Sequence, residues 1–116
     1  MKSYTDLEQS KKLAEFLPLE SADMYYTPPL VKGHTAYIPH LKRKFPIDWD
    51  IEQAIPCWSL TALFSVLPNA CCGIDKGDGK YVASYLVSNE CGTYTSDNPI
   101  DACVNMIEYL HELKLL

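Results

Sequence analysis

The chain has 116 residues, of which 47% are hydrophobic and 22% are charged. This length and composition predict a single globular domain over residues 1–116 and argue against wholesale disorder. The formal net charge of −5 argues against nucleic-acid binding, because such binding depends largely on basic side chains that neutralise phosphates. The short basic run at residues 42–44 is too small to reverse that balance.

The sequence further predicts a cytoplasmic protein with reduced thiols. Its N-terminal residues are polar and contain no apolar signal core. No apolar run is long enough to span a membrane, so no membrane association is expected. The five cysteines are an odd number, which without a signal peptide favours free thiols over disulfides.

A first helix is predicted over residues 6–17. Thr5 and Glu8 have the spacing of a capping box, in which a hydroxyl and a carboxylate each bond to a backbone amide of the first turn. Apolar residues recur at helical spacing as far as Pro18, which ends the pattern. A short helical turn is expected to follow at residues 20–24.

A long irregular segment is predicted at residues 25–55, with extended structure only at residues 35–38, because prolines and a glycine interrupt it. We expect its aromatic side chains to pack the segment onto the core. The alternative is a small-ligand pocket within residues 25–58, since aromatic-rich irregular segments form such pockets. The candidate binding residues are Tyr25, Tyr26, Tyr37, Trp49 and Trp58.

The stretch IPCWSLTALFSVLP, residues 55–68, predicts a buried helix. Pro56 suits the first helical turn, where its missing N–H costs nothing. Leucines follow at helical spacing, and Pro68 closes the segment. In this arrangement Cys57 lies at the helix N-terminus, where backbone amides stabilise a thiolate and lower its pKa.

Cys57 is therefore the candidate nucleophile of an alternative function, a small cysteine-dependent hydrolase or transferase. The Cys57-Trp58 pair resembles the helix start of papain-like cysteine peptidases, although the residues before it depart from that pattern. His111 is the one histidine downstream and thus the candidate base. Its position near the end of the last predicted helix favours a surface role, so we favour a buried structural thiol at Cys57.

The stretch CCGIDKGDGKY, residues 71–81, concentrates residue types found in metal and phosphate sites. Its spacing fits neither an EF-hand nor a phosphate-binding loop, and its adjacent cysteines fit neither a zinc ligand pair nor a Cys-x-x-Cys redox pair. We therefore predict no metal and no cofactor. The stretch is interpreted as a turn at residues 75–79, preceded by a short strand at residues 71–74.

Two strands and a helix are predicted to complete the chain. Residues 80–88 alternate in the manner of a strand, and residues 90–96 pair back on them. Asn98, Pro99 and Asp101 then stand at the positions that favour a helix start, and an apolar stripe follows. The predicted fold is α+β, with a small antiparallel sheet of about two to four strands packed against about three helices.

Three blocks of the chain together carry a resemblance to a known group. They are EQSKKLAEFLPLESADMYY, IPCWSLTALFSVLP and DNPIDACVNMIEYL, in that order. In these blocks the chain resembles short proteins of phages and integrated mobile elements of gut bacteria. The resemblance implies a small cytoplasmic accessory protein, and it implies no activity and no functional residue.

The function class favoured by the sequence is a non-enzymatic accessory or protein-binding protein. No catalytic set, metal spacing or basic face is evident, and the tyrosines and tryptophans of residues 25–58 are of the kind that dominate binding surfaces. The expected partner is another protein or a second copy of the chain.

Overall fold

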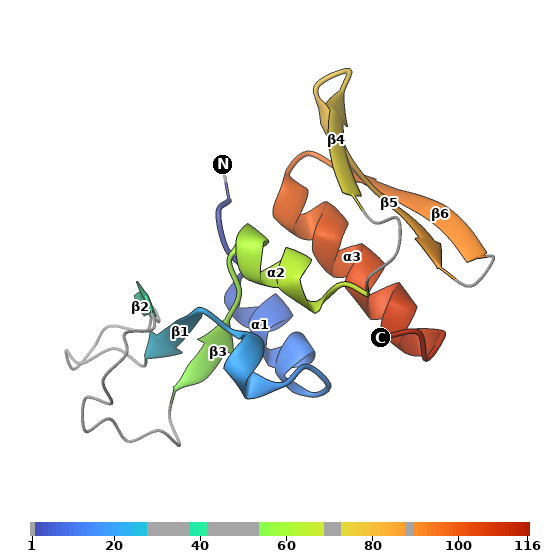
Figure 1. Cartoon of the computed structure of the whole chain (residues 1–116). Coiled ribbons are helices and arrows are strands. Elements are labelled where there is room, and N and C mark those ends of the chain that lie inside the picture. Colours follow the sequence, from blue (N-terminus) through green and yellow to red (C-terminus); the bar gives the residue numbers. More distant parts are fainter. Residues whose placement is uncertain (1, 28–37, 42–53, 69–72, 88–89) are drawn as a thin grey trace.

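The computed structural model describes residues 2–27, 38–41, 54–68, 73–87 and 90–116. These residues form an α+β fold, which confirms the predicted class, with two small antiparallel sheets in place of one (Figure 1). In chain order the elements are α1 (Leu7–Ala14), the 3-10 helix η1 (Leu19–Ser21), β1 (Met24–Thr27), β2 (Ile38–Leu41), β3 (Ile55–Cys57), α2 (Leu60–Val66), β4 (Gly73–Gly77), β5 (Lys80–Val87), β6 (Glu90–Ser96) and α3 (Pro99–Glu112).

The first sheet has the strand order β2-β1-β3. Its central strand, β1, runs antiparallel to both neighbours and pairs Tyr26 with Pro39 on one side and with Ile55 on the other. The prediction of irregular structure over residues 25–55 is therefore wrong at β1 and β2. Pro39 lies in an edge strand, where a residue without an N–H is tolerated. Most of the extended stretch predicted at residues 35–38 lies outside the described residues.

The second α-helix begins later than predicted. Ser59 caps α2, and its hydroxyl accepts a hydrogen bond from the Ala62 amide at 3.2 Å. The placement of Pro56 in the first helical turn is wrong, because Pro56 lies in β3, the other edge strand of the first sheet. Cys57 consequently ends a strand and does not occupy a helix N-terminus.

The first helix is capped by Asp6 rather than by Thr5. The Asp6 side chain accepts from the Gln9 amide at 2.8 Å, and the Gln9 side chain accepts from the Asp6 amide at 3.0 Å, so the capping box is shifted by one residue. Thr5 is fully buried and its hydroxyl is used elsewhere. The helix ends at Ala14, short of the predicted end. The short helical turn predicted at residues 20–24 is present as η1, shifted toward the N-terminus to Leu19–Ser21.

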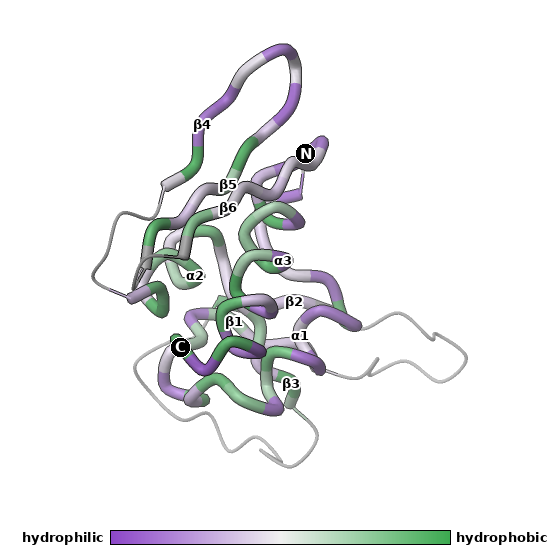
Figure 2. The backbone as a smooth tube through the Cα atoms, turned by 90° about the vertical axis from the view of Figure 1, so that its right-hand side faces the viewer, coloured by the Kyte–Doolittle hydropathy of each residue, from purple (hydrophilic) through white to green (hydrophobic). Residues whose placement is uncertain are grey.

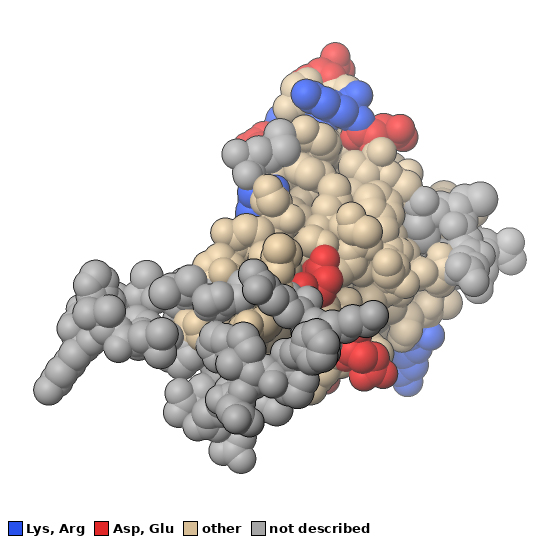
Figure 3. Space-filling model, turned by 60° about the vertical axis from the view of Figure 1, so that its left-hand side comes forward, with Lys and Arg blue, Asp and Glu red and all other residues tan. Residues whose placement is uncertain are grey.

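The second sheet, β4-β5-β6, has the predicted hairpins, but residues 75–77, predicted to lie in the turn, belong to β4. Asp78 and Gly79, with φ of 51° and 76°, form the two-residue turn between Gly77 and Lys80. Both positions require the left-handed region that glycine, and less readily aspartate, adopts. Charged side chains gather at the tip of this hairpin (Figure 3). Residues 71–72 of the predicted preceding strand lie outside the described residues.

The last helix, α3, begins as predicted and organises the core. Asn98 caps it by accepting from the Asp101 amide at 2.8 Å, and Pro99 follows at the first helical position. α3 packs against β5 and β6 on one side and against α2 on the other (Figure 1).

Two apolar clusters meet along α3, and Figure 2 gives the hydropathy of each residue along the backbone. One joins α1, α2 and α3 around Trp58, and the other joins Ala83 and Tyr85 of β5 to α3. Leu116 packs against both clusters, so the two are continuous.

Candidate functional site

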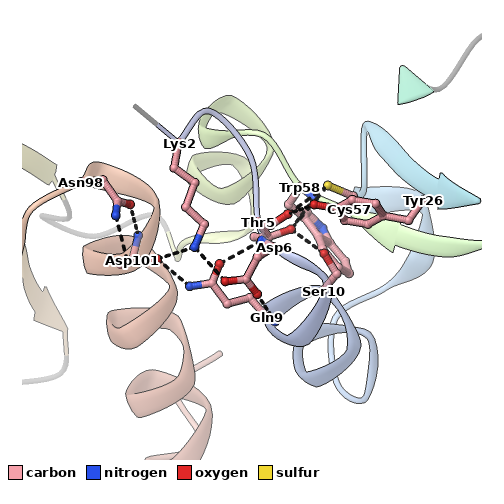
Figure 4. Close-up of polar contacts among 10 residues, drawn as sticks. All are labelled: Lys2, Thr5, Asp6, Gln9, Ser10, Tyr26, Cys57, Trp58, Asn98 and Asp101. Atoms are coloured by element: carbon pink, nitrogen blue, oxygen red, sulfur yellow. Dashed lines mark hydrogen bonds and ion pairs between the residues drawn. The ribbon is translucent and has the colours of Figure 1, made fainter. Parts of the chain in front are cut away.

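Cys57 lies in a closed polar cluster centred on Thr5 (Figure 4). The Cys57 side chain is 0% exposed, and its sulfur donates to the Thr5 carbonyl at 3.4 Å. The Thr5 hydroxyl lies 2.7 Å from Ser10 Oγ and accepts from the Trp58 backbone amide at 3.1 Å. The Tyr26 hydroxyl donates to the Thr5 carbonyl at 2.7 Å. The cluster therefore fixes the N-terminal segment to β3 and leaves no opening for a substrate.

The environment of Cys57 disfavours a thiolate. Burial raises the pKa of the Cys57 thiol, and hydrogen bonds from Thr5, Ser10 and Tyr26 offset only part of that rise. The predicted lowering of the pKa depended on a helix N-terminus that Cys57 does not occupy. The physical argument for a reactive Cys57 is thus removed.

His111, the candidate base, lies in a different part of the fold. It is exposed in the last turn of α3, and its ring stacks on Phe16 with a centroid distance of 3.9 Å and an interplanar angle of 9°. Cys57 makes its contacts with Thr5 in the buried cluster. The two residues therefore have separate surroundings and separate partners.

A polar connection ties the N-terminal ends of α1 and α3 together (Figure 4). The Asp101 carboxylate accepts from Lys2 Nζ at 2.7 Å and from Gln9 Nε2 at 2.7 Å, and its other oxygen accepts from Asn98 at 2.7 Å. Burial raises the pKa of the Asp101 carboxyl, but these hydrogen bonds outweigh that effect and hold the pKa below its usual range.

The two helices therefore run in the same direction. Gln9 contacts Asp101 near their N-terminal ends, and Phe16, just beyond α1, contacts His111 near the C-terminal end of α3. The negative ends of both helix dipoles consequently lie on the same side of the molecule.

A surface groove of about 400 Å³ lies at this shared end of the two helices. We call it the α1–α3 groove. The Phe16–His111 stack provides its aromatic part. Its lining consists of Lys12, Glu15, Phe16, Glu108, His111 and Glu112.

The α1–α3 groove has a negative character. Its lining has three carboxylates against one ammonium group, and Glu15 is also the C-cap of α1. The C-terminal carbonyls of both helices add partial negative charge. The groove is thus suited to a cationic group.

The sequence singled out one residue of this groove, His111, but for a catalytic role. By helical spacing alone, Glu108 and Glu112 lie on the polar side of α3, and Phe16 follows the apolar side of α1. Each helix by itself has the pattern of an ordinary amphipathic helix. Their meeting depends on tertiary packing, so no sequence signal pointed to the groove.

The predicted aromatic binding residues do not form one surface in the described residues. Trp58 is 0% exposed and its indole N–H donates to Ser21 Oγ at 2.9 Å. Tyr26 is 6% exposed and meets Tyr4 edge-to-face. Tyr25 is half-buried in β1. Tyr37 and Trp49 lie outside the described residues.

The described parts of the chain lack two features. No group of at least three histidine, cysteine, aspartate or glutamate side chains there is arranged to hold a metal ion. None of the helices described is long and apolar enough to cross a membrane. Comparisons of the chain with protein-family models, curated proteins and solved structures found no match.

Proposed function

We propose that the protein is a non-catalytic binding protein whose α1–α3 groove receives a basic segment of a partner protein. The single observation that supports this proposal is the lining of the groove, which contains three carboxylates and an aromatic stack at the negative ends of two helices.

Charge complementarity favours arginine as the side chain that enters the groove. A guanidinium group forms paired hydrogen bonds with a carboxylate and also stacks on flat rings. The Phe16–His111 stack offers such a ring beside Glu108 and Glu112. A lysine ammonium would use the carboxylates but gain less from the ring face, so a preference for arginine follows.

The size of the groove agrees with a side chain or a short segment. About 400 Å³ falls at the lower end of the volumes seen for small-ligand pockets, which span roughly 300–1,000 Å³. Such pockets are mostly apolar, whereas four of the six lining residues here carry charge. The lining thus favours a charged peptide over an apolar small molecule.

We place this role in the cytoplasm, as an accessory protein of the kind implied by the phage and mobile-element resemblance. Cys57 and Cys91 are free thiols, and reducing compartments maintain that state.

Fluorescence anisotropy with a labelled arginine-rich octapeptide tests the proposed function. The double substitution Glu108→Gln with Glu112→Gln removes two charges from the groove. Glu8→Gln with Glu20→Gln is the matched control, because both residues are exposed and neither lines the groove. Both double variants change the net charge equally, so a general attraction of the acidic chain for a basic peptide affects them alike.

We expect the groove variant to weaken binding about tenfold, since two partly exposed ion pairs contribute roughly 0.5–1 kcal/mol each. The control should change the dissociation constant less than about twofold. A lysine-rich octapeptide should bind more weakly than the arginine-rich one. Equal effects of the two double variants, or no saturable binding by the wild type, would refute the proposal.

A further inference from the structure

The strand β6 forms one edge of the second sheet. It pairs with β5 along its whole length, from Glu90 opposite Val87 to Ser96 opposite Tyr81, without a bulge. No described helix or strand lies alongside its other edge (Figure 1). A regular strand with one open edge is a template for pairing with another strand.

The turn between β4 and β5 determines which backbone groups of β5 face each neighbour. Because Asp78 and Gly79 form a two-residue turn, Gly77 and Lys80 are the hydrogen-bonded pair that closes it. Successive residues of a strand direct their amides and carbonyls to opposite edges. Even-numbered residues of β5 therefore bond to β4, and odd-numbered residues bond to β6.

The same alternation determines the free edge of β6. The odd-numbered residues of β5 pair with Gly92, Tyr94 and Ser96, so these residues bond inward to β5. The amides and carbonyls of Cys91, Thr93 and Thr95 accordingly point to the open edge. The open edge thus presents three donor and acceptor sets spaced for an antiparallel ladder.

From Cys91 to Ser96 this edge lacks the features that usually prevent strand pairing, and the charged Glu90 stands only at the first position of β6. Proline, charged side chains and bulges protect natural edge strands. Among the described edge strands, β2 contains Pro39, β3 contains Pro56, and β4 contains Asp75 and Lys76. Residues 91–96 of β6 contain no proline and no charged side chain.

We propose that two copies of the chain pair through β6 in an antiparallel, two-fold symmetric arrangement, giving a continuous six-stranded sheet. The symmetry axis passes beside Thr93, so that Thr93 lies opposite its counterpart and Cys91 lies opposite the partner's Thr95. The outward backbone groups of each copy then bond to those of the other.

The side chains are compatible with this register. Opposed threonines form favourable cross-strand pairs, and residues 91–96 bring no like charges together despite the net charge of −5. On the α3 face, Gly92 lies opposite the partner's Tyr94, and the Tyr85 ring of the same chain covers Gly92. A second copy therefore fits the edge better than a charged peptide, and this inference does not depend on the α1–α3 groove.

Amide hydrogen exchange of the wild-type chain at rising protein concentration tests the pairing. Dimerisation should slow exchange at Cys91, Thr93 and Thr95 at least about tenfold between dilute and millimolar protein. Gly92 and Tyr94 bond within the monomer, so their exchange should change little. If exchange at the amides of Cys91, Thr93 and Thr95 does not depend on protein concentration, the inference is overturned.

Sedimentation velocity of two variants provides the second test. Thr93→Pro removes an outward N–H without removing a bond to β5, and Thr93→Val keeps the N–H and the branched shape. The wild type and Thr93→Val should dimerise with concentration, whereas Thr93→Pro should stay monomeric with an unchanged circular dichroism spectrum. A strictly monomeric wild type, or a Thr93→Pro variant that dimerises equally well, contradicts the proposal. If Thr93→Pro does not fold, the exchange experiment on the wild type decides.

Discussion

Replacement of Thr5 by valine tests the role of the buried polar cluster. Valine keeps the branched shape of threonine but removes a hydroxyl that is 0% exposed. That hydroxyl accepts from the Trp58 amide at 3.1 Å and lies 2.7 Å from Ser10 Oγ. Both groups would lose a hydrogen-bond partner in a region closed to water.

The expected loss of stability follows from these two contacts. An orphaned buried backbone amide costs about 1–3 kcal/mol, and a lost hydroxyl contact costs about 1 kcal/mol. Thr5→Val should therefore lower the free energy of unfolding by about 3 kcal/mol, a large part of the roughly 5–15 kcal/mol typical of a domain. Thr5→Ser is the control: it keeps the hydroxyl and loses one methyl group, at about 1 kcal/mol.

Urea unfolding followed by tryptophan fluorescence and circular dichroism measures both variants. Addition of Ser10→Ala to Thr5→Val should cost little more, because the Ser10 hydroxyl has already lost its contact with Thr5. If Thr5→Val is no less stable than Thr5→Ser, the reasoning about the hydroxyl is refuted.

Three further predictions concern other parts of the described chain. Asp101→Asn should lower the free energy of unfolding by about 1 kcal/mol at neutral pH. The folded-state pKa of Asp101 is lowered. The stability difference should therefore be present above about pH 4 and shrink as the pH falls through the folded-state pKa. Urea unfolding at neutral pH and at a pH below the folded-state pKa measures it. In the native protein, the exposed Cys91 should react with a thiol reagent well before Cys57, because burial raises the pKa of the Cys57 thiol. Peptide mass mapping determines the order of modification. Equal rates at the two cysteines would contradict the burial of Cys57. Gly92→Ala places a methyl carbon 2.9 Å from the Tyr85 ring and should lower the free energy of unfolding by about 1–3 kcal/mol. Gly73→Ala meets no atom within 4 Å and should lower it much less. Thermal unfolding of both variants measures the difference.

The elements that the sequence predicts correctly have strong local signals. The start of α3 follows from Asn98 and Pro99, which satisfy the helix terminus without any distant partner. The β4–β5 hairpin follows from Asp78 and Gly79, because few other residues adopt the left-handed conformations that the turn requires. These choices depend on neighbours in the chain and can therefore be read from it.

The incorrect predictions concern residues whose conformation depends on distant partners. Pro56 is compatible both with a first helical turn and with an edge strand, and its place opposite Tyr25 in β1 decides between them. Thr5 and Asp6 are both suitable helix caps. Asp6 takes that position because the Thr5 hydroxyl is required inside the cluster.

For the candidate sites too, the sequence shows the features that depend on neighbouring residues and not those that depend on distant contacts. The sequence identified Cys57 as a notable thiol, but its closure beneath Thr5 requires the N-terminal segment to lie beside β3. The α1–α3 groove requires two helix ends from opposite ends of the chain to meet at Phe16 and His111. By itself the sequence determined the class of fold, the C-terminal hairpin and the caps of α3, because backbone groups there find their partners nearby. The tertiary structure decided the first sheet, the burial of Cys57 and the negative groove, because each is made by contacts between residues far apart in the chain.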